Sequence, residues 1–84
     1  MTETGPADDP AAIEQHSVLL RGHRTSISLE RIFWQGLIAA ATAEGLTVNA
    51  LAARIDEART GNLSSAIRVF LMQRLSGTSS DQGA

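Results

Sequence analysis

The chain has 84 residues, no cysteine and a formal net charge of −2 at pH 7. It is long enough for one small domain, which has no disulfide to stabilise it. Short chains without disulfides commonly gain buried apolar surface by oligomerisation, so we expect a homodimer.

Charge is distributed unevenly along the chain. Residues 1–17 carry four acidic residues and no basic one, whereas residues 18–75 carry seven arginines against four acidic residues, a net charge of +3. Arginine makes bidentate contacts with phosphate and with guanine. The middle of the chain therefore has the charge expected of a nucleic-acid-binding domain, although the whole chain is acidic.

The two ends of the chain have the composition of disordered tails. Residues 1–15 are rich in Pro, Ala, Asp and Glu without an apolar period, and residues 76–84 are similarly polar. The acidic N-terminus does not resemble a signal peptide, and the longest mainly apolar stretch, residues 32–43, is too short to span a bilayer. We expect one domain over residues 16–75 in a cytoplasmic protein that does not enter a membrane.

A β-strand is predicted within residues 18–29, because apolar and polar side chains alternate there. Its apolar row ends in Ile27 and Leu29, and its polar row consists of Arg24, Ser26 and Ser28. Gly22 interrupts the run from Val18 to Arg21, which is either an extension of the strand or an extended arm.

The first two helices follow the strand. Apolar residues at spacings of three and four predict a helix over about residues 30–44, and Gly45 is placed to end it in a left-handed conformation. Thr47 is placed to cap a second helix over about residues 48–59.

A third helix is predicted to begin after Asn62 and to run through Leu75. Asn62 can cap its first turn, and Gly77 lies just beyond its expected end. The order of elements is thus one short strand followed by three helices.

A single strand leaves the backbone groups on both of its edges unpaired, so it needs a partner. Pairing with the same strand of a second chain gives an antiparallel intersubunit ribbon. Ile27 and Leu29 then face the helices, and Arg24, Ser26 and Ser28 face outward. This arrangement predicts an intertwined homodimer.

The segment R-T-S-I-S-L, the helix after it and the segment G-L-T-V-N-A-L together resemble the ribbon-helix-helix superfamily of MetJ and Arc type. The resemblance rests on the strand alternation, the sixteen-residue interval from Leu29 to Gly45, and the turn formed by Gly45, Thr47 and Asn49. The longer stretch over residues 22–75 is similar to a bacterial subgroup that carries a third helix.

The resemblance implies a mostly α-helical fold that binds double-stranded DNA, with the ribbon in the major groove. Base contacts are expected from Arg24, Ser26 and Ser28, with the serines discriminating weakly between bases. Phosphate contacts are expected from Arg21, His23, Thr47, Val48 and Asn49, where the last three form a helix N-terminus. The dimer core is expected to contain Ile27, Leu29, Phe33, Leu37, Leu51 and Ile55.

The predicted function is therefore sequence-specific DNA binding by a dimeric transcriptional repressor or autoregulator, whose dimers could assemble further along DNA. No cofactor, metal site or catalytic group is expected, because the two histidines lack a common metal spacing and no nucleophile motif is present. The alternative is a protein-interaction module, either an antitoxin or an adaptor, that uses the helical dimer surface. The C-terminal segment offers an antitoxin no apolar anchor, which favours DNA binding.

Overall fold

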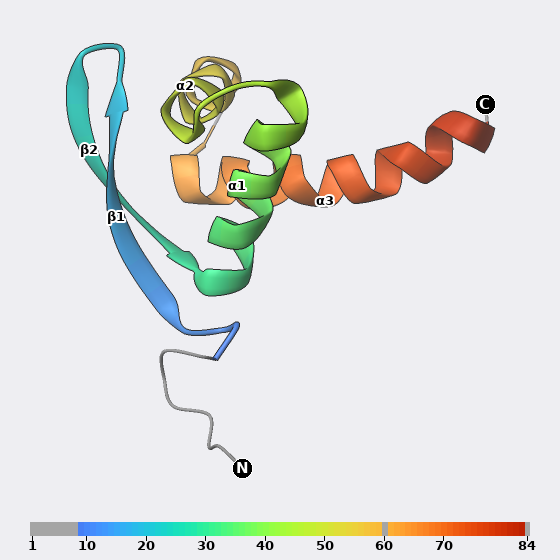
Figure 1. Cartoon of the computed structure of the whole chain (residues 1–84), viewed down its shortest axis with the longest axis horizontal. Helices are drawn as coiled ribbons and strands as arrows, with labels where there is room; N and C mark the ends of the chain where they lie inside the picture. Colours follow the sequence, from blue (N-terminus) through green and yellow to red (C-terminus); the bar gives the residue numbers. More distant parts are fainter. Residues whose placement is uncertain (1–8, 60, 84) are drawn as a thin grey trace.

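The computed structural model describes residues 9–59 and 61–83 of the chain, and it places a β-hairpin beside three helices (Figure 1). The elements are, in order, β1 (Ile13–Leu20), β2 (His23–Glu30), α1 (Arg31–Glu44), α2 (Val48–Ala58) and α3 (Leu63–Gly83). The hairpin lies on one side of the domain and the helices lie against one of its faces (Figure 1).

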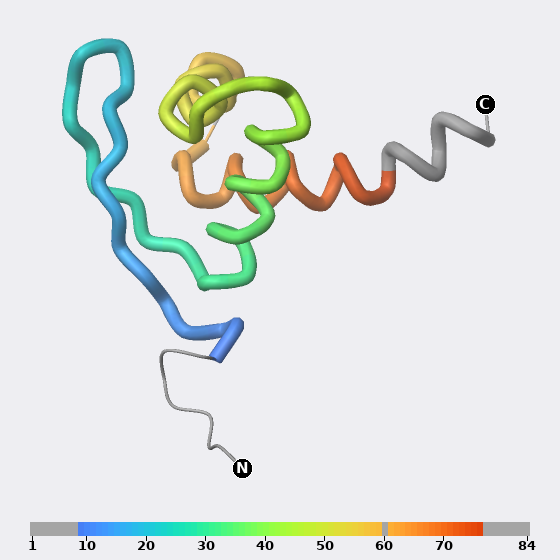
Figure 2. The backbone as a smooth tube through the Cα atoms, in the orientation of Figure 1, coloured from blue at the N-terminus to red at the C-terminus, as the bar shows by residue number. Residues whose placement is uncertain are grey.

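Strands β1 and β2 pair antiparallel along their whole length, from Leu20 opposite His23 to Ile13 opposite Glu30. The backbone trace of Figure 2 shows the two strands side by side up to the tight connection between them. That connection is the two-residue turn Arg21–Gly22, with φ values of 50° and 87°. Two positive φ values in succession define a type I′ turn, whose twist suits a hairpin.

The hairpin corrects the prediction of one strand per chain. The ribbon shared between two chains stays a prediction, because β1 pairs with only one of the two edges of β2. The partner of β2 is β1 of the same chain, because residues 13–20 form a strand and the turn brings it back in register. Residues 13–15, predicted to belong to a disordered tail, are the first part of β1. Residues 1–8 of that predicted tail lie outside the described residues.

Gly22 gives a direct test of the turn. Its φ of 87° is unfavourable for a residue with a Cβ, although an added Cβ would meet no atom within 4 Å. We expect Gly22→Ala to lower the free energy of unfolding by about 1–2 kcal/mol through backbone strain alone. Urea unfolding measures the change, and Gly61→Ala, at a glycine that is equally open and has no positive φ, serves as the control. Equal stability of the two variants would contradict the turn.

The helix ends follow the predicted capping residues. Gly45 ends α1 with a φ of 73°, Thr47 Oγ1 accepts a hydrogen bond from the backbone N–H of Ala50, and Asn62 Oδ1 accepts one from the N–H of Ser65. The C-terminal prediction needs correction, because α3 continues through Gly77 to Gly83. Gly77 does not end α3, and residues 76–83, predicted as a disordered tail, belong to it.

The core lies between the inner face of the hairpin and the helices. Both strands contribute to it, together with one face of each helix. Its buried members are Val18, Leu20, Ile27, Leu29, Trp34, Leu37, Ala40, Ala41, Leu51, Ala52, Ile55, Ile67 and Leu71. Of the six residues predicted for the dimer core, five are buried inside this single chain and Phe33 is half-buried. The contribution of β1 means that these side chains are covered without a second chain.

Candidate nucleic-acid interface

The outer face of the hairpin is open to solvent. Residues directly opposite each other in an antiparallel pair point to the same face of the sheet. The register therefore places two rows on the outer face, namely Gln15, Ser17 and Leu19 of β1 and Arg24, Ser26 and Ser28 of β2. All six residues are exposed, whereas Val18, Leu20, Ile27 and Leu29 of the opposite face are buried.

The three residues predicted to contact bases thus lie together on an exposed face, as the alternation in the sequence indicates. The β1 row was not predicted. The sequence signal for β1 is the Arg21–Gly22 pair, which lies between two possible strand segments of equal length. This signal is weak, because the usual residue pairs of a type I′ turn are Asn-Gly and Asp-Gly. The side chains of Gln15, Ser17 and Leu19 therefore enlarge the candidate interface from one row to two.

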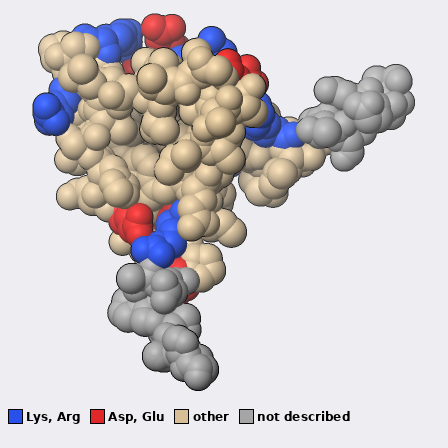
Figure 3. Space-filling view, in the orientation of Figure 1, with Lys and Arg blue, Asp and Glu red and all other residues tan. Residues whose placement is uncertain are grey.

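Most of the arginines are already neutralised by carboxylates within the domain. Figure 3 shows the resulting pattern, in which basic and acidic surface lie side by side at the top of the view and again at its lower end. The ion pairs join Arg21 and Arg59 to Asp56, Arg31 to Glu14, Arg68 to Glu30, and Arg74 to Glu44, with N–O distances of 2.6–3.0 Å.

Two arginines, Arg24 and Arg54, have no carboxylate partner among the residues that the structure describes. Arg24 lies on the outer face of the hairpin, and Arg54 lies on α2, beside a groove between α2 and α3. The outer face therefore carries an arginine whose charge remains available to an external anion.

Arg21 and His23, the residues near the hairpin tip that are predicted to contact phosphate, differ from Arg24 in their surroundings. Arg21 is exposed, yet its Nη2 lies 2.8 Å from Oδ2 of Asp56. Asp56 is also bound by Arg59, and hydrogen bonds from Arg59 and then Arg21 hold the pKa of its carboxyl below the usual value. His23 lies opposite Leu20 and so points toward the helix side of the hairpin, where it remains exposed. Arg21 and His23 therefore flank the outer face rather than lie on it.

The N-terminus of α2 lies beside the outer edge of β1. The side chain of Thr47 caps its own helix, and Asn49 Oδ1 accepts a hydrogen bond from the backbone N–H of Leu19 at 3.2 Å. Val48 is half-buried. The side chains predicted to contact phosphate are thus engaged within the domain, and the backbone amides of Val48 and Asn49 are the groups of this turn left for an anion.

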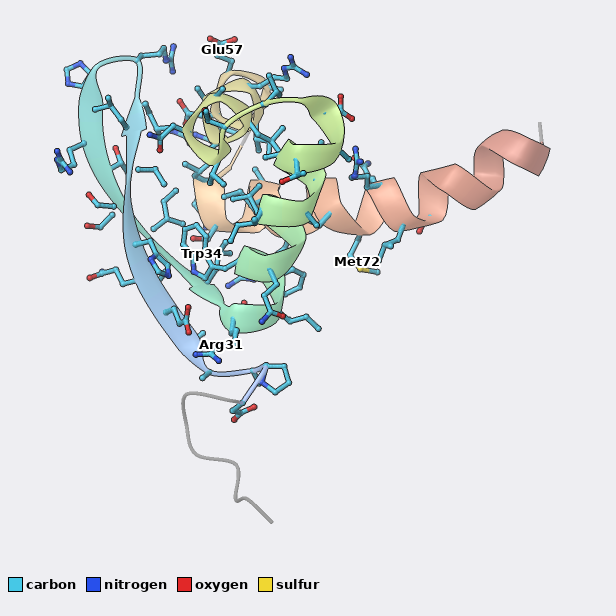
Figure 4. The ribbon with its side chains drawn as sticks, viewed as in Figure 1. Arg31, Trp34, Glu57 and Met72 are labelled. Carbon is cyan, nitrogen blue, oxygen red and sulfur yellow. The ribbon has the colours of Figure 1, made fainter. Side chains whose placement is uncertain are left out.

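A cluster of four residues holds the beginning of β1 against α1. Trp34 Nε1 donates to the carbonyl oxygen of Glu14 at 2.8 Å, Arg31 Nε donates to Glu14 Oε2 at 2.8 Å, and the His16 ring packs edge-on against Trp34 with centroids 4.6 Å apart. Figure 4 shows Arg31 and Trp34 extending from α1 toward the hairpin. The cluster fixes the hairpin on the helices without using any residue of the outer face.

Three carboxyl groups with lowered pKa values make the fold sensitive to acid. Hydrogen bonds from His16 and then Arg31 lower the pKa of Glu14. The pKa of Glu30 is lowered by a hydrogen bond from the backbone N–H of Glu30 itself and then by one from Arg68. Hydrogen bonds from Arg59 and then Arg21 lower the pKa of Asp56. Because these pKa values are lower in the folded state, the pairs stabilise the fold above the pKa values of the unfolded chain. This stabilisation is lost as pH falls through the lowered values.

We therefore expect the contribution of these three carboxyl groups to the free energy of unfolding to decrease below about pH 4.5. Urea unfolding at a series of pH values measures this, with the fluorescence of the single tryptophan, Trp34, as the signal. Asp56→Asn and Glu14→Gln should each flatten the decrease. A decrease of the same size in both variants and the wild type would show that these pairs are not its cause.

Among the described residues, no three or more His, Cys, Asp or Glu side chains lie together so that they could hold a metal ion. In the same part of the chain no single helix is long and apolar enough to cross a membrane, and only α1 and α2 taken together, with a 100° bend between them, meet that criterion.

Comparison with known proteins identifies the fold. A family model described as "Ribbon-helix-helix domain" matches residues 13–75, which confirms the resemblance stated above and the predicted ribbon-helix-helix fold class, whereas the homodimer stays a prediction. Among solved structures, the chain is similar to an uncharacterized protein from Bordetella pertussis Tohama I, with a TM-score of 0.73 and 24% identity, over 86% of this chain and 62% of that one. At this identity the likeness concerns the fold alone. No curated protein matches the chain.

Proposed function

This chain belongs to the ribbon-helix-helix family, and on that premise we propose that it binds double-stranded DNA through the outer face of its hairpin and acts as a transcriptional repressor or autoregulator. Ribbon-helix-helix domains generally bind DNA as transcription regulators. The observation that carries the proposal for this chain is Arg24, an arginine without a carboxylate partner among the described residues, on a solvent-exposed sheet face.

The dimensions of the hairpin suit the major groove. That groove is about 12 Å wide and admits a two-stranded β-ribbon, whose strands lie about 4.8 Å apart. Arg24 can make two hydrogen bonds to guanine, Gln15 can do the same to adenine, and the serines can donate to or accept from any base. Phosphates beside the groove are then within reach of the α2 N-terminus and of Arg21 at the tip.

We propose that the protein acts as a homodimer in which each chain brings its own ribbon. Ribbon-helix-helix domains typically dimerise. A ribbon shared between chains would join two hairpins into four strands, wider than the major groove. Ser28, whose carbonyl points to the free edge of β2, already accepts a hydrogen bond from Ser64 of α3 at 3.1 Å. Two chains with separate ribbons would read two half-sites on one duplex.

Binding to a pool of random duplexes across a salt series tests the function. We expect the logarithm of the affinity to fall linearly with the logarithm of the salt concentration, because cationic groups displace counterions from the phosphates. Light scattering of the protein alone and with duplex gives the stoichiometry. Absence of binding at low salt would overturn the DNA-binding function, and binding by a single chain would overturn the homodimer alone.

The second candidate is a protein-interaction module, either an antitoxin or an adaptor. It is favoured by apolar side chains exposed on the helices, among them Ile32 of α1 and Met72 and Leu75 of α3, which are 54%, 54% and 73% exposed. Figure 4 shows Met72 pointing away from the body of the domain. Absence of DNA binding, with a folded protein, would turn the search to a partner for this helical surface.

A further inference from the structure

Leu19 is an apolar residue on the mainly polar outer face of the hairpin. Its side chain is 48% exposed, whereas its neighbours Val18 and Leu20 are 4% and 7% exposed and belong to the core. Because successive residues of a strand point to opposite faces, burial of both neighbours forces the Leu19 side chain outward. The core therefore does not account for an apolar side chain at this position.

The backbone of Leu19 is anchored to the helices. Its N–H donates to Asn49 Oδ1 at 3.2 Å, and Asn49 lies in the first turn of α2, which Thr47 caps. Both the hairpin and α2 thus fix the position of Leu19. A side chain that contacts a ligand specifically needs such a fixed position.

Leu19 lies directly opposite Arg24 in the strand register. Side chains that face each other across two strands have Cβ atoms about 4.5–5.5 Å apart, whereas successive base pairs are stacked about 3.4 Å apart. A ribbon in the major groove would therefore bring Leu19 and Arg24 to the same or neighbouring base pairs. Arg24 suits the two acceptors of guanine, and the apolar group exposed in that groove is the C5-methyl of thymine.

We propose that Leu19 is a specificity-determining residue that contacts the C5-methyl group of a thymine beside the guanine bound by Arg24. This inference rests on the DNA-binding function proposed above and adds its preferred ligand, a duplex in which a G·C pair adjoins an A·T pair. It also gives β1 a part in recognition that the sequence alone did not suggest.

Ile13 provides the matched control. It is the other strongly exposed apolar residue of the outer face, at 59%, but it lies at the far end of β1 and opposite Glu30. Glu30 is ion-paired with Arg68 at 3.0 Å and offers nothing to a base acceptor. If an exposed apolar side chain on this face acted only through general contact, Ile13→Ala and Leu19→Ala would behave alike.

The experiment uses a duplex selected by the wild-type protein from a random pool, in which each thymine in turn is replaced by deoxyuridine, which lacks the methyl group. At one thymine beside the guanine, we expect the replacement to weaken wild-type binding about fourfold, the effect of one buried methyl group. Leu19→Ala should bind the two duplexes within about twofold of each other, whereas Ile13→Ala should retain the wild-type difference.

If deoxyuridine has no effect on wild-type binding at any position while Arg24→Ala still weakens binding, the role of Leu19 is overturned. The proposed DNA-binding function then still holds. A loss of the methyl effect in Ile13→Ala as well as Leu19→Ala would also overturn it. Failure of the wild type to bind any duplex would overturn both proposals. The wild-type comparison needs no variant, so absence of a deoxyuridine effect overturns the role of Leu19 even if Leu19→Ala does not fold.

Discussion

Arg24→Ala is expected to weaken binding to a selected duplex by about 1–3 kcal/mol, or roughly 5- to 150-fold. Arg24 makes no ion pair among the described residues, so the substitution removes a charge from the outer face without leaving a carboxylate unpaired. Stability should change by less than about 0.5 kcal/mol, as for a typical surface substitution. Fluorescence anisotropy with labelled selected and random duplexes measures the effect.

The comparison of the two duplexes distinguishes a base contact from a phosphate contact. Loss of a base contact weakens binding to the selected duplex more than to the random one, whereas loss of a phosphate contact weakens both equally. Arg54→Ala is the matched control, because Arg54 also lacks a carboxylate partner in the described part of the chain but lies on α2 beside the groove with α3. Equal losses in Arg24→Ala and Arg54→Ala would contradict the assignment of the outer face.

Val18→Glu is expected to lower the free energy of unfolding by about 3 kcal/mol or more, because it places an unpaired charge among core side chains. Val18 is 4% exposed on the inner face of β1. A domain of this size has about 5–15 kcal/mol of stability in total, so the variant should unfold at a much lower urea concentration. Unfolding followed by Trp34 fluorescence measures the loss.

Ser17→Glu changes the adjacent residue on the opposite face and should give the reverse result. Ser17 is exposed and lies opposite Ser26, so stability should remain within about 0.5 kcal/mol of the wild type. A negative charge facing the phosphates should weaken duplex binding about tenfold or more. If Val18→Glu were harmless to folding, β1 would not lie on the helices as described. If Ser17→Glu bound DNA normally, the outer face would not be the DNA-binding surface.

Features that depend on neighbouring residues were predictable from the sequence. The alternation over residues 24–29 predicted which side chains of β2 point outward, and the spacing of apolar residues predicted three helices in the right order. Gly45, Thr47 and Asn62 act at the helix ends as their residue types indicate. These are local effects, since a cap or a helix period is set within a few residues of the chain.

The end of α3 and the pairing of β1 were not predictable in the same way. Gly77 resembles a helix terminator but lies within α3, because a glycine lowers helix propensity without forbidding a helix. Residues 13–20 have no simple alternation, since Val18, Leu19 and Leu20 form a continuous apolar run. Their assignment to two faces depends on the register with β2, which the turn at Arg21–Gly22 sets.

The sequence by itself determined the family, the order of the helices and the outward row that contains Arg24. Only the tertiary structure decided which arginines remain available, because the ion pairs of Arg21, Arg31, Arg68 and Arg74 join residues 17 to 38 positions apart. It also decided that β2 pairs with a strand of its own chain. Both outcomes depend on how segments that are far apart in the sequence pack together. They could not be predicted, because the type of a residue and its local spacing do not indicate which distant residue it contacts.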